Sequence, residues 1–157
     1  MIAISVSLIG FLRYEKYKTR PENLDFFIKL LSAYRLELKW SRKSLDDIVK
    51  NFHYKGYESY LKEIVSMLDK KTKLEAYAEE NSYFEKMYLT QEDRSVLKYF
   101  FSECGKGSMF SELNLCEKTL ETLEAKKQEA AAEFKKQGTL SLKLGVLCGV
   151  WLAIMLL

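Results

Sequence analysis

The sequence has few of the residues that interrupt helices, with one proline and seven glycines among 157 residues. It also lacks the alternation of apolar and polar residues that is typical of a half-buried strand. Apolar residues instead recur every three or four positions, which is the helical period. With 48% apolar and 30% charged residues, the chain can form one domain with a real core. We therefore expect an all-α fold.

Cysteine is scarce as well, and the three cysteines show no C-x-x-C spacing. They are Cys104, Cys116 and Cys148, and an odd number argues against a disulfide framework and for a reducing compartment. We expect them to be small apolar residues within the fold.

Residues that carry chemistry are also missing. The only histidine, His53, has no second ligand for a metal and no Ser or Cys partner at a recognisable spacing. No glycine-rich phosphate loop and no nucleophile elbow occur. The formal net charge is only +3, without the concentrated basic stripe of a nucleic-acid binder. We expect no catalytic residues, no metal, no cofactor and no nucleic-acid partner.

Two apolar ends are what the sequence does have. Residues 1–12 precede the first charge, and residues 144–157 carry no charge at all. No basic residue precedes the first run and no small-x-small site follows it, so a signal peptide is not indicated. Both runs have basic residues on their inner side: Arg13, Lys16, Arg20, Lys136 and Lys143. By the positive-inside rule, everything between the two runs is expected to face the cytoplasm.

The length of the last run leaves its role open. Fourteen helical residues reach about 21 Å, whereas a bilayer core is about 30 Å thick. Extending the helix back to Leu140 gives about 27 Å, which a thinned bilayer or paired helices could accommodate. Gly145 and Gly149 form a G-x-x-x-G face, and Gly10 offers a matching small surface. We expect two paired membrane segments, with a buried core helix as the alternative.

Capping residues mark the helices of the middle region. Pro21 is expected at a first helical position. Ser44 and Thr90 each have an Asp three residues later, as in a capping box, and Ser108 can cap the last helix. Gly105 is expected to end the helix before it. Six helices are counted between the membrane segments, one of them around Leu74–Tyr88.

The most regular pattern runs along the last helix. Apolar residues from Leu113 onward alternate steps of three and four, and the same steps continue into the final apolar run. We predict an antiparallel six-helix bundle with N- and C-terminal membrane helices, in which the last helix is continuous into the membrane and Gly138 is its weak point. The predicted divisions are a membrane segment (1–12), a basic connection (13–20), a cytosolic bundle (21–138) and a second membrane segment (139–157).

Three stretches resemble one known family. The opening GFLRYEKYKTRPENLDFFIKLLSAYRLEL, the stretch EDRSVLKYF and the closing LGVLCGVWLAIMLL resemble the stage III sporulation protein AB family over essentially the whole chain. The matching residues are Gly10, Phe11, Arg20, Pro21, Leu24, Glu37, Leu38, Asp93, Leu97, Phe100, Leu144, Gly145, Leu147 and Gly149. The sequence departs from the family pattern at Phe101, Ser108, Glu112 and 139–141, and it has a shorter apolar run before Gly10.

The resemblance implies a non-enzymatic role in endospore formation. Members of the family sit in the mother-cell membrane around the forespore, within a channel or secretion-like complex. Their soluble part is similar to the helical domain of type II secretion and type IV pilus platform proteins, which implies docking of a cytoplasmic secretion-type ATPase. Glu37 and Glu112 are the expected partner contacts, although Glu37 could equally form an ion pair within the bundle. Arg20 and Pro21 are expected to set a turn between anchor and bundle.

One alternative is unrelated to sporulation. In it the chain is a tail-anchored coiled-coil adaptor, only the last helix inserts, and residues 1–12 are buried in the bundle. The two interpretations therefore differ in where they place the first twelve residues.

Overall fold

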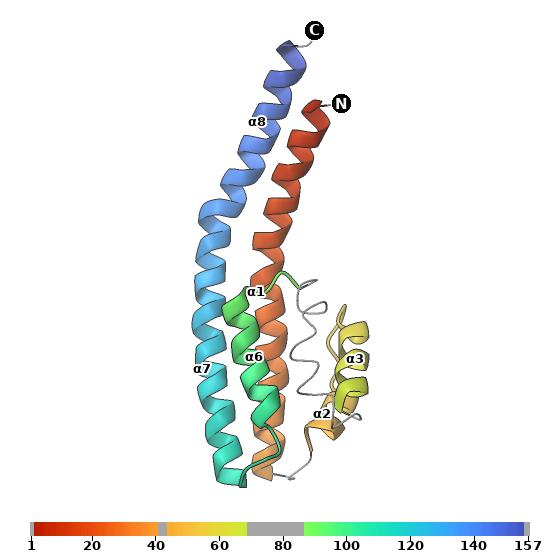
Figure 1. Cartoon of the computed structure of the whole chain (residues 1–157), viewed down its shortest axis with the longest axis vertical. Helices are drawn as coiled ribbons and strands as arrows, with labels where there is room; N and C mark the ends of the chain where they lie inside the picture. The colour runs from red at the N-terminus through yellow and green to blue at the C-terminus, as the bar shows by residue number, and fades with distance from the viewer. Residues whose placement is uncertain (1, 41–43, 69–86, 156–157) are drawn as a thin grey trace.

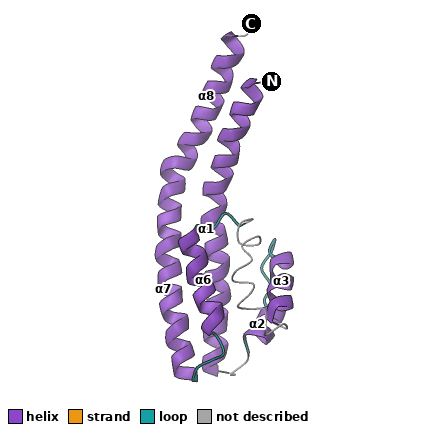
Figure 2. Cartoon of the chain, in the orientation of Figure 1, coloured by secondary structure: helices purple, strands orange, loops and turns teal. Residues whose placement is uncertain are grey.

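The computed structural model describes residues 2–40, 44–68 and 87–155, and all regular structure in these ranges is helical (Figure 2). The all-α prediction is thus confirmed for the part of the chain that is described. The elements are α1 (Ile2–Trp40), α2 (Leu45–Asn51), α3 (Glu58–Leu68), α6 (Gln91–Glu103), α7 (Met109–Glu133), the π-helix η1 (Phe134–Gly138) and α8 (Thr139–Met155).

Two long helical runs form the frame of the molecule. One is α1, with 39 residues, and the other is the continuous run α7–η1–α8. They pack against each other along their length, and the two chain termini lie at the same end (Figure 1). We call residues 2–17 of α1 with residues 134–155 the stalk, and residues 18–40, 44–68 and 87–133 the body.

Helix α1 corrects the prediction of a turn at Arg20 and Pro21. Pro21 lies in the interior of the helix and does not begin it. A proline removes one backbone hydrogen bond and crowds the preceding turn, but contacts on both sides hold the helix here. Arg20 is paired with residues of α6 and α7, and Leu24 is fully buried. The predicted first segment, connection and first bundle helix are therefore one helix.

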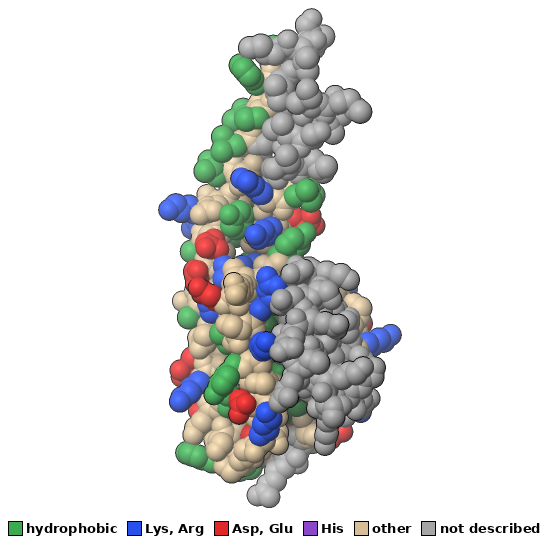
Figure 3. Space-filling view, viewed as in Figure 1, with side chains coloured by type: hydrophobic (Ala, Val, Ile, Leu, Met, Phe, Trp, Pro, Cys, Tyr) green, Lys and Arg blue, Asp and Glu red, His purple; other side chains and the backbone are tan. Residues whose placement is uncertain are grey.

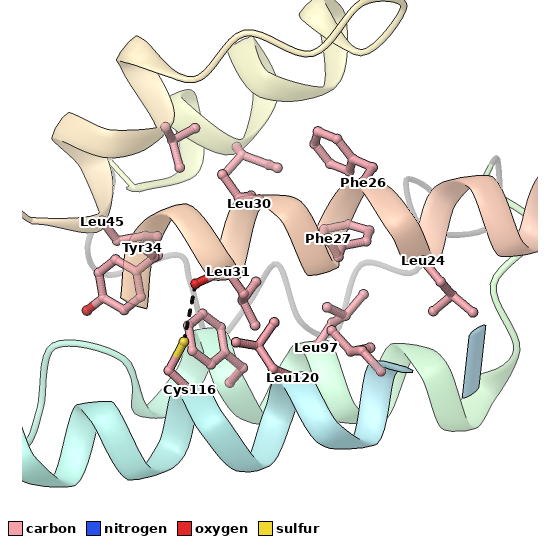
Figure 4. Packing of buried hydrophobic residues seen from close by; sticks show 14 of the residues in the cluster. Leu24, Phe26, Phe27, Leu30, Leu31, Tyr34, Leu45, Leu97, Cys116 and Leu120 are labelled. Carbon is pink, nitrogen blue, oxygen red and sulfur yellow. Dashed lines mark hydrogen bonds between the residues drawn. The ribbon is translucent and has the colours of Figure 1, made fainter. Parts of the chain in front are cut away.

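The core lies in the body, between α1, α6 and α7 (Figure 4). Apolar residues of α1 at steps of three and four are buried and meet apolar residues of α6 and α7: Leu24, Phe27, Leu31, Tyr34, Leu38, Leu97, Phe100, Leu120 and Leu123. Cys116 is fully buried, and its thiol donates a hydrogen bond to the Leu31 carbonyl at 3.4 Å. Phe26 turns to the other side of α1 and stacks on Tyr57, with ring centroids 4.5 Å apart.

The predicted helix caps are confirmed. Ser44, Thr90 and Ser108 each accept a hydrogen bond from the backbone N–H three residues later. Asp93 returns the bond at Thr90 and completes a capping box. Gly105 follows α6 with a φ of +82°, a left-handed conformation that glycine adopts without strain.

The last helical run is continuous, as predicted, and changes its winding next to the expected weak point. Five residues, Phe134–Gly138, form the π-helix η1 between α7 and α8. Gly138 is buried there, and a Cβ at this position would lie 2.6 Å from Cδ2 of Phe134 and 3.4 Å from Cβ of Tyr17. The absence of a side chain at Gly138 therefore lets α1 and the wide turn approach each other.

Two parts of the prediction remain unconfirmed. The helix expected around Leu74–Tyr88 falls mostly on residues 69–86, outside the described residues, so the count of six stays a prediction. Among the described helices, none combines the length and the apolar character that crossing a bilayer requires. The membrane helices are therefore not confirmed.

Candidate functional site

The stalk exposes most of the large apolar side chains that are accessible in the described residues. Thirteen such side chains are exposed, and eight of them belong to the stalk: Phe11, Leu12, Leu140, Leu144, Val146, Leu147, Trp151 and Ile154. Figure 3 shows hydrophobic side chains along one edge of the stalk, with Lys and Arg where the stalk meets the body. Large contiguous apolar surfaces mark sites of interaction with protein or lipid.

Aromatic and amide side chains join the two helical runs of the stalk at its base. The rings of Tyr14 and Phe134 lie with centroids 5.5 Å apart. The Tyr17 hydroxyl donates a hydrogen bond to Oε1 of Gln137 at 2.7 Å. These contacts place residues 14–17 of α1 level with η1.

Directly on the body side of this junction lies a buried ion-pair network centred on Arg20. Its guanidinium binds Asp93 through two hydrogen bonds, from Nε to Oδ2 at 2.8 Å and from Nη2 to Oδ1 at 3.1 Å. Nη1 donates to Oε2 of Glu133 at 2.7 Å. Arg20 is 6% exposed and Asp93 is fully buried, whereas the Glu133 side chain is 39% exposed. The network therefore joins α1 to α6 by a buried ion pair and to α7 by a partly exposed one.

Asp93 carries two functions at once. Its carboxylate accepts the backbone N–H of Thr90 at 2.9 Å, which caps α6, in addition to the bonds from Arg20. Burial alone raises the pKa of Asp93, but the hydrogen bonds from Arg20 and Thr90 outweigh burial and hold the pKa below its usual value. The carboxylate is therefore ionised at neutral pH, as the pair with Arg20 requires.

A second ionic cluster lies nearby on α1, around Asp25. Its carboxylate accepts hydrogen bonds from Lys127 at 2.6 Å and from the Tyr54 hydroxyl at 3.0 Å, and it pairs with Lys29 at 2.7 Å. Burial raises the pKa of Asp25, yet the bonds from Lys127, Lys29 and Tyr54 lower it to about 2. This cluster ties α1 to α7 and to the loop between α2 and α3.

The predicted basic residues divide into two groups. Arg13, Lys16, Lys136 and Lys143 are exposed at the base of the stalk. Arg20 is not among them, because its charge is enclosed by Asp93 and Glu133. Arg20 therefore joins three helices, and its position next to a membrane stays a prediction.

The two predicted partner contacts are both on the body. Glu37 is half-buried on α1 and takes part in interactions within the chain. Glu112 is half-buried on α7 and accepts a hydrogen bond from the Tyr34 hydroxyl at 3.1 Å. The thiol of Cys104 donates to the same hydroxyl oxygen at 3.2 Å, and burial raises the pKa of that thiol to about 11. The role of Glu37 and Glu112 in binding a partner stays a prediction.

The remaining predicted residues have simpler outcomes. Gly10 lies in α1, and Gly145 and Gly149 lie in α8, but the described side chains do not include their surroundings, so their packing stays a prediction. His53 is exposed in the loop after α2, with Nδ1 2.8 Å from the Asn51 carbonyl oxygen. Among the described residues, no group of three His, Cys, Asp or Glu is placed to hold a metal ion.

Sequence reasoning missed the polar groups that join distant segments. The partnership of Arg20 with Asp93 spans 73 positions, and only the resemblance singled out both residues. Asn23 is buried, donates to the Met87 carbonyl at 2.6 Å and accepts from the Tyr57 hydroxyl at 2.6 Å. A polar residue within the apolar stripe of α1 was the one available signal.

Comparison of the sequence with models of known protein families shows to which family the chain belongs. The family model of stage III sporulation protein AB matches residues 1–157, the whole chain. The chain belongs to the stage III sporulation protein AB family. Membership in this family supports a role in sporulation and confirms the resemblance carried by both ends of the sequence. Neither a curated protein nor a solved structure matches the chain.

Proposed function

We propose that this protein is a non-enzymatic platform component of a secretion-like sporulation complex in the mother-cell membrane around the forespore. In this proposal the stalk lies in lipid, and the body faces the cytoplasm and docks a secretion-type ATPase. The single observation that carries the proposal is the stalk itself, where both ends of the chain pair and still expose large apolar side chains.

The dimensions of the stalk support insertion of the pair as a unit. Helix α8 has 17 residues, which at 1.5 Å per residue rise about 25 Å. This is a few Å less than a typical hydrocarbon core, and a bilayer accommodates such a mismatch by local thinning. Pairing with α1 reduces the backbone that each helix presents to lipid. Lipid is therefore the environment that suits exposed Leu144, Leu147 and Trp151.

The docking part of the proposal rests on the family resemblance and on the build of the body. The buried ion pair of Arg20 with Asp93 and the partly exposed ion pair of Asp25 with Lys127 connect α1 with α6 and α7. In this proposal a force applied to the body reaches the stalk through the single long helix α1. Glu37 and Glu112 are the acidic side chains through which we propose contact with a basic surface of the ATPase.

Stepwise deletion in sporulating cells tests the membrane part. Removal of residues 139–157 is expected to weaken attachment but to leave part of the protein in the membrane fraction, held by residues 2–12. Removal of both segments is expected to release the body entirely. Complete release after removal of 139–157 alone contradicts the paired stalk and favours the tail-anchored adaptor.

Co-purification with the complex tests the docking part. A Glu37→Lys variant is expected to lose the ATPase from detergent-solubilised membranes while the variant itself stays in the membrane. The matched control is Glu121→Lys, an equally charged change at an exposed position of α7. Retention of the ATPase by Glu37→Lys, or its loss from both variants, contradicts the assignment of Glu37.

The adaptor alternative has one structural consequence that the described residues contradict. It requires residues 1–12 to be buried in the bundle, whereas Phe11 and Leu12 are each 50% exposed. Helix α1 also carries these residues away from α6 and alongside α8 (Figure 1).

A further inference from the structure

We propose that the base of the stalk binds the headgroups of anionic phospholipids. This inference rests on the proposed insertion of the stalk and adds the class of lipid that it selects. The binding surface, which we call the basic collar, is formed by six side chains of α1, η1 and α8 at the base of the stalk and on the adjoining first residue of the body: Arg13, Lys16, Lys18, Lys135, Lys136 and Lys143.

The contacts at the base of the stalk bring this collar together. Tyr14 faces Phe134, and Tyr17 binds Gln137, so the cations of α1 and those of η1 stand at the same height. Lys143 lies less than two turns further along α8. The cations of α1 and η1, more than one hundred positions apart in the sequence, thus lie at one level of the helical pair, and Lys143 lies beyond them within the apolar run of α8.

The charges of the collar are accessible. All six side chains are exposed, and none of them forms an ion pair with another described residue. The one acidic residue within these stretches is Glu15. Arg20 shows the contrast, because its guanidinium is saturated by Asp93 and Glu133. The collar therefore has accessible positive charge that an anionic partner can bind.

The position of the collar identifies that partner as lipid. The exposed apolar side chains begin with Phe11 and Leu140, immediately next to the collar. With the apolar part in the hydrocarbon core, the cations of α1 and η1 lie at the depth of the phosphate groups, and Lys143, three residues beyond Leu140, reaches that depth by extending its side chain. Anionic lipids attract basic side chains at a membrane surface, and long Lys and Arg side chains reach the headgroups readily. A soluble anion could bind the basic collar, but it would not account for the exposed apolar side chains next to it, whereas a lipid accounts for both.

Quenching of tryptophan fluorescence by brominated lipids tests the inference. The chain has two tryptophans, and a Trp40→Phe change leaves Trp151 on the stalk as the single reporter. The full-length protein is reconstituted in phosphatidylcholine vesicles that contain an equal, low fraction of either brominated phosphatidylcholine or brominated phosphatidylglycerol. We expect phosphatidylglycerol to associate about fivefold more strongly than phosphatidylcholine at low salt, a preference that falls as salt is raised.

Two variants in the Trp40→Phe background complete the test. Changing Lys16, Lys136 and Lys143 to Gln is expected to reduce the preference to nearly one, with unchanged quenching by brominated phosphatidylcholine. In the matched control, Lys62, Lys98 and Lys118, which are exposed on the body, are changed to Gln. This control is expected to keep the preference for phosphatidylglycerol over phosphatidylcholine.

The outcomes separate this inference from the proposed function. Equal quenching by both lipids, or an equal loss of preference in the two variants, overturns the basic collar while the inserted stalk stands. Absence of quenching by either lipid overturns insertion itself, and the collar with it.

Discussion

The body and the stalk are built from the same two helical runs, but their side chains meet different surroundings. In the body, a third helix covers the pair, and Leu31 of α1 and Leu123 of α7 are fully buried. In the stalk nothing described covers the pair, and Leu147 of α8 remains 65% exposed. The local structure is helical in both regions. The two regions therefore differ in what packs on the helices, and this difference is the basis of our proposal that the stalk has an outside partner.

The charges show the same contrast within one helix. Arg20 is enclosed in the body by Asp93 and Glu133, and Arg13, two turns earlier, is exposed on the stalk. A buried arginine holds helices together, whereas an exposed one is available for lipid. The following predictions test this division, beginning with the largest expected effect.

Polar substitution of the exposed side chains of α8 is expected to weaken membrane binding strongly, with residual attachment through residues 2–12. Changing Leu144, Leu147 and Trp151 to Gln removes three apolar side chains from lipid, each worth about 1.5–3 kcal/mol. Partition of the purified protein into vesicles is expected to fall on the order of a thousandfold or more, as measured by flotation. The same number of changes on the body, at Leu36, Tyr99 and Phe110, is expected to leave flotation unchanged. A similar fall in flotation of both variants contradicts the assignment of membrane binding to the stalk and not to the body.

Breaking the network at the junction is expected to destabilise the body strongly. An Arg20→Met variant leaves the buried Asp93 carboxylate without its cation, a kind of change that costs about 3–5 kcal/mol. Arg13→Met, an equal change at an exposed position, is expected to alter the free energy of unfolding by less than about 0.5 kcal/mol. Denaturant unfolding in detergent measures both. Equal stability of the two variants means that the ion pair does not hold the helices.

A substitution that adds a side chain at Gly138 tests how closely the two helical runs pack at the base of the stalk. Alanine normally stabilises a helix relative to glycine by roughly 1 kcal/mol. Here its Cβ meets the Phe134 ring, so Gly138→Ala is expected to destabilise by about 1–3 kcal/mol. A second change, Phe134→Leu, is expected to recover part of the loss in thermal unfolding. A gain in stability from Gly138→Ala alone refutes the tight packing.

The smallest predicted effect concerns acid. The pKa of Asp25 is about 2 in the folded protein and 3.8 in the unfolded reference. The unfolded state therefore binds the proton first, and the stability due to Asp25 is present above pH 3.8 and lost as the pH falls toward 2. Asp25→Asn is expected to reduce this decline by an amount of order 1 kcal/mol. Thermal midpoints across this range measure it, and identical slopes for both proteins contradict the assigned pKa.

Much of the fold could be predicted because its signals are local. The caps at Ser44, Thr90 and Ser108 need only residues three positions apart, and the buried stripe of α1 follows from one helical period. The continuous last helix with its irregularity beside Gly138 was also predictable from a single period and a single glycine.

The predictions failed where contacts between residues far apart in the sequence determine the local structure. Pro21 was expected to begin a helix, but Arg20 and Leu24 bind partners on α6 and α7 and keep the helix intact around it. Local propensity does not include such partners. The site shared this weakness: Arg20 was grouped with the basic residues next to the membrane, and Asp93 was assigned as a cap and as part of the family pattern, but the contact between the two was not foreseen.

The most direct test of the central claim compares two side chains of equal exposure. Leu147 on the stalk is 65% exposed, and Tyr99 on the body is 62% exposed. In a chain whose three native cysteines are replaced, a nitroxide label is placed at either position, and the protein is reconstituted in vesicles. The account predicts that oxygen, which partitions into lipid, relaxes the label at 147 more than a water-soluble nickel chelate does, with the opposite order at 99. A label at 147 that the nickel chelate reaches as readily as the label at 99 would contradict the account.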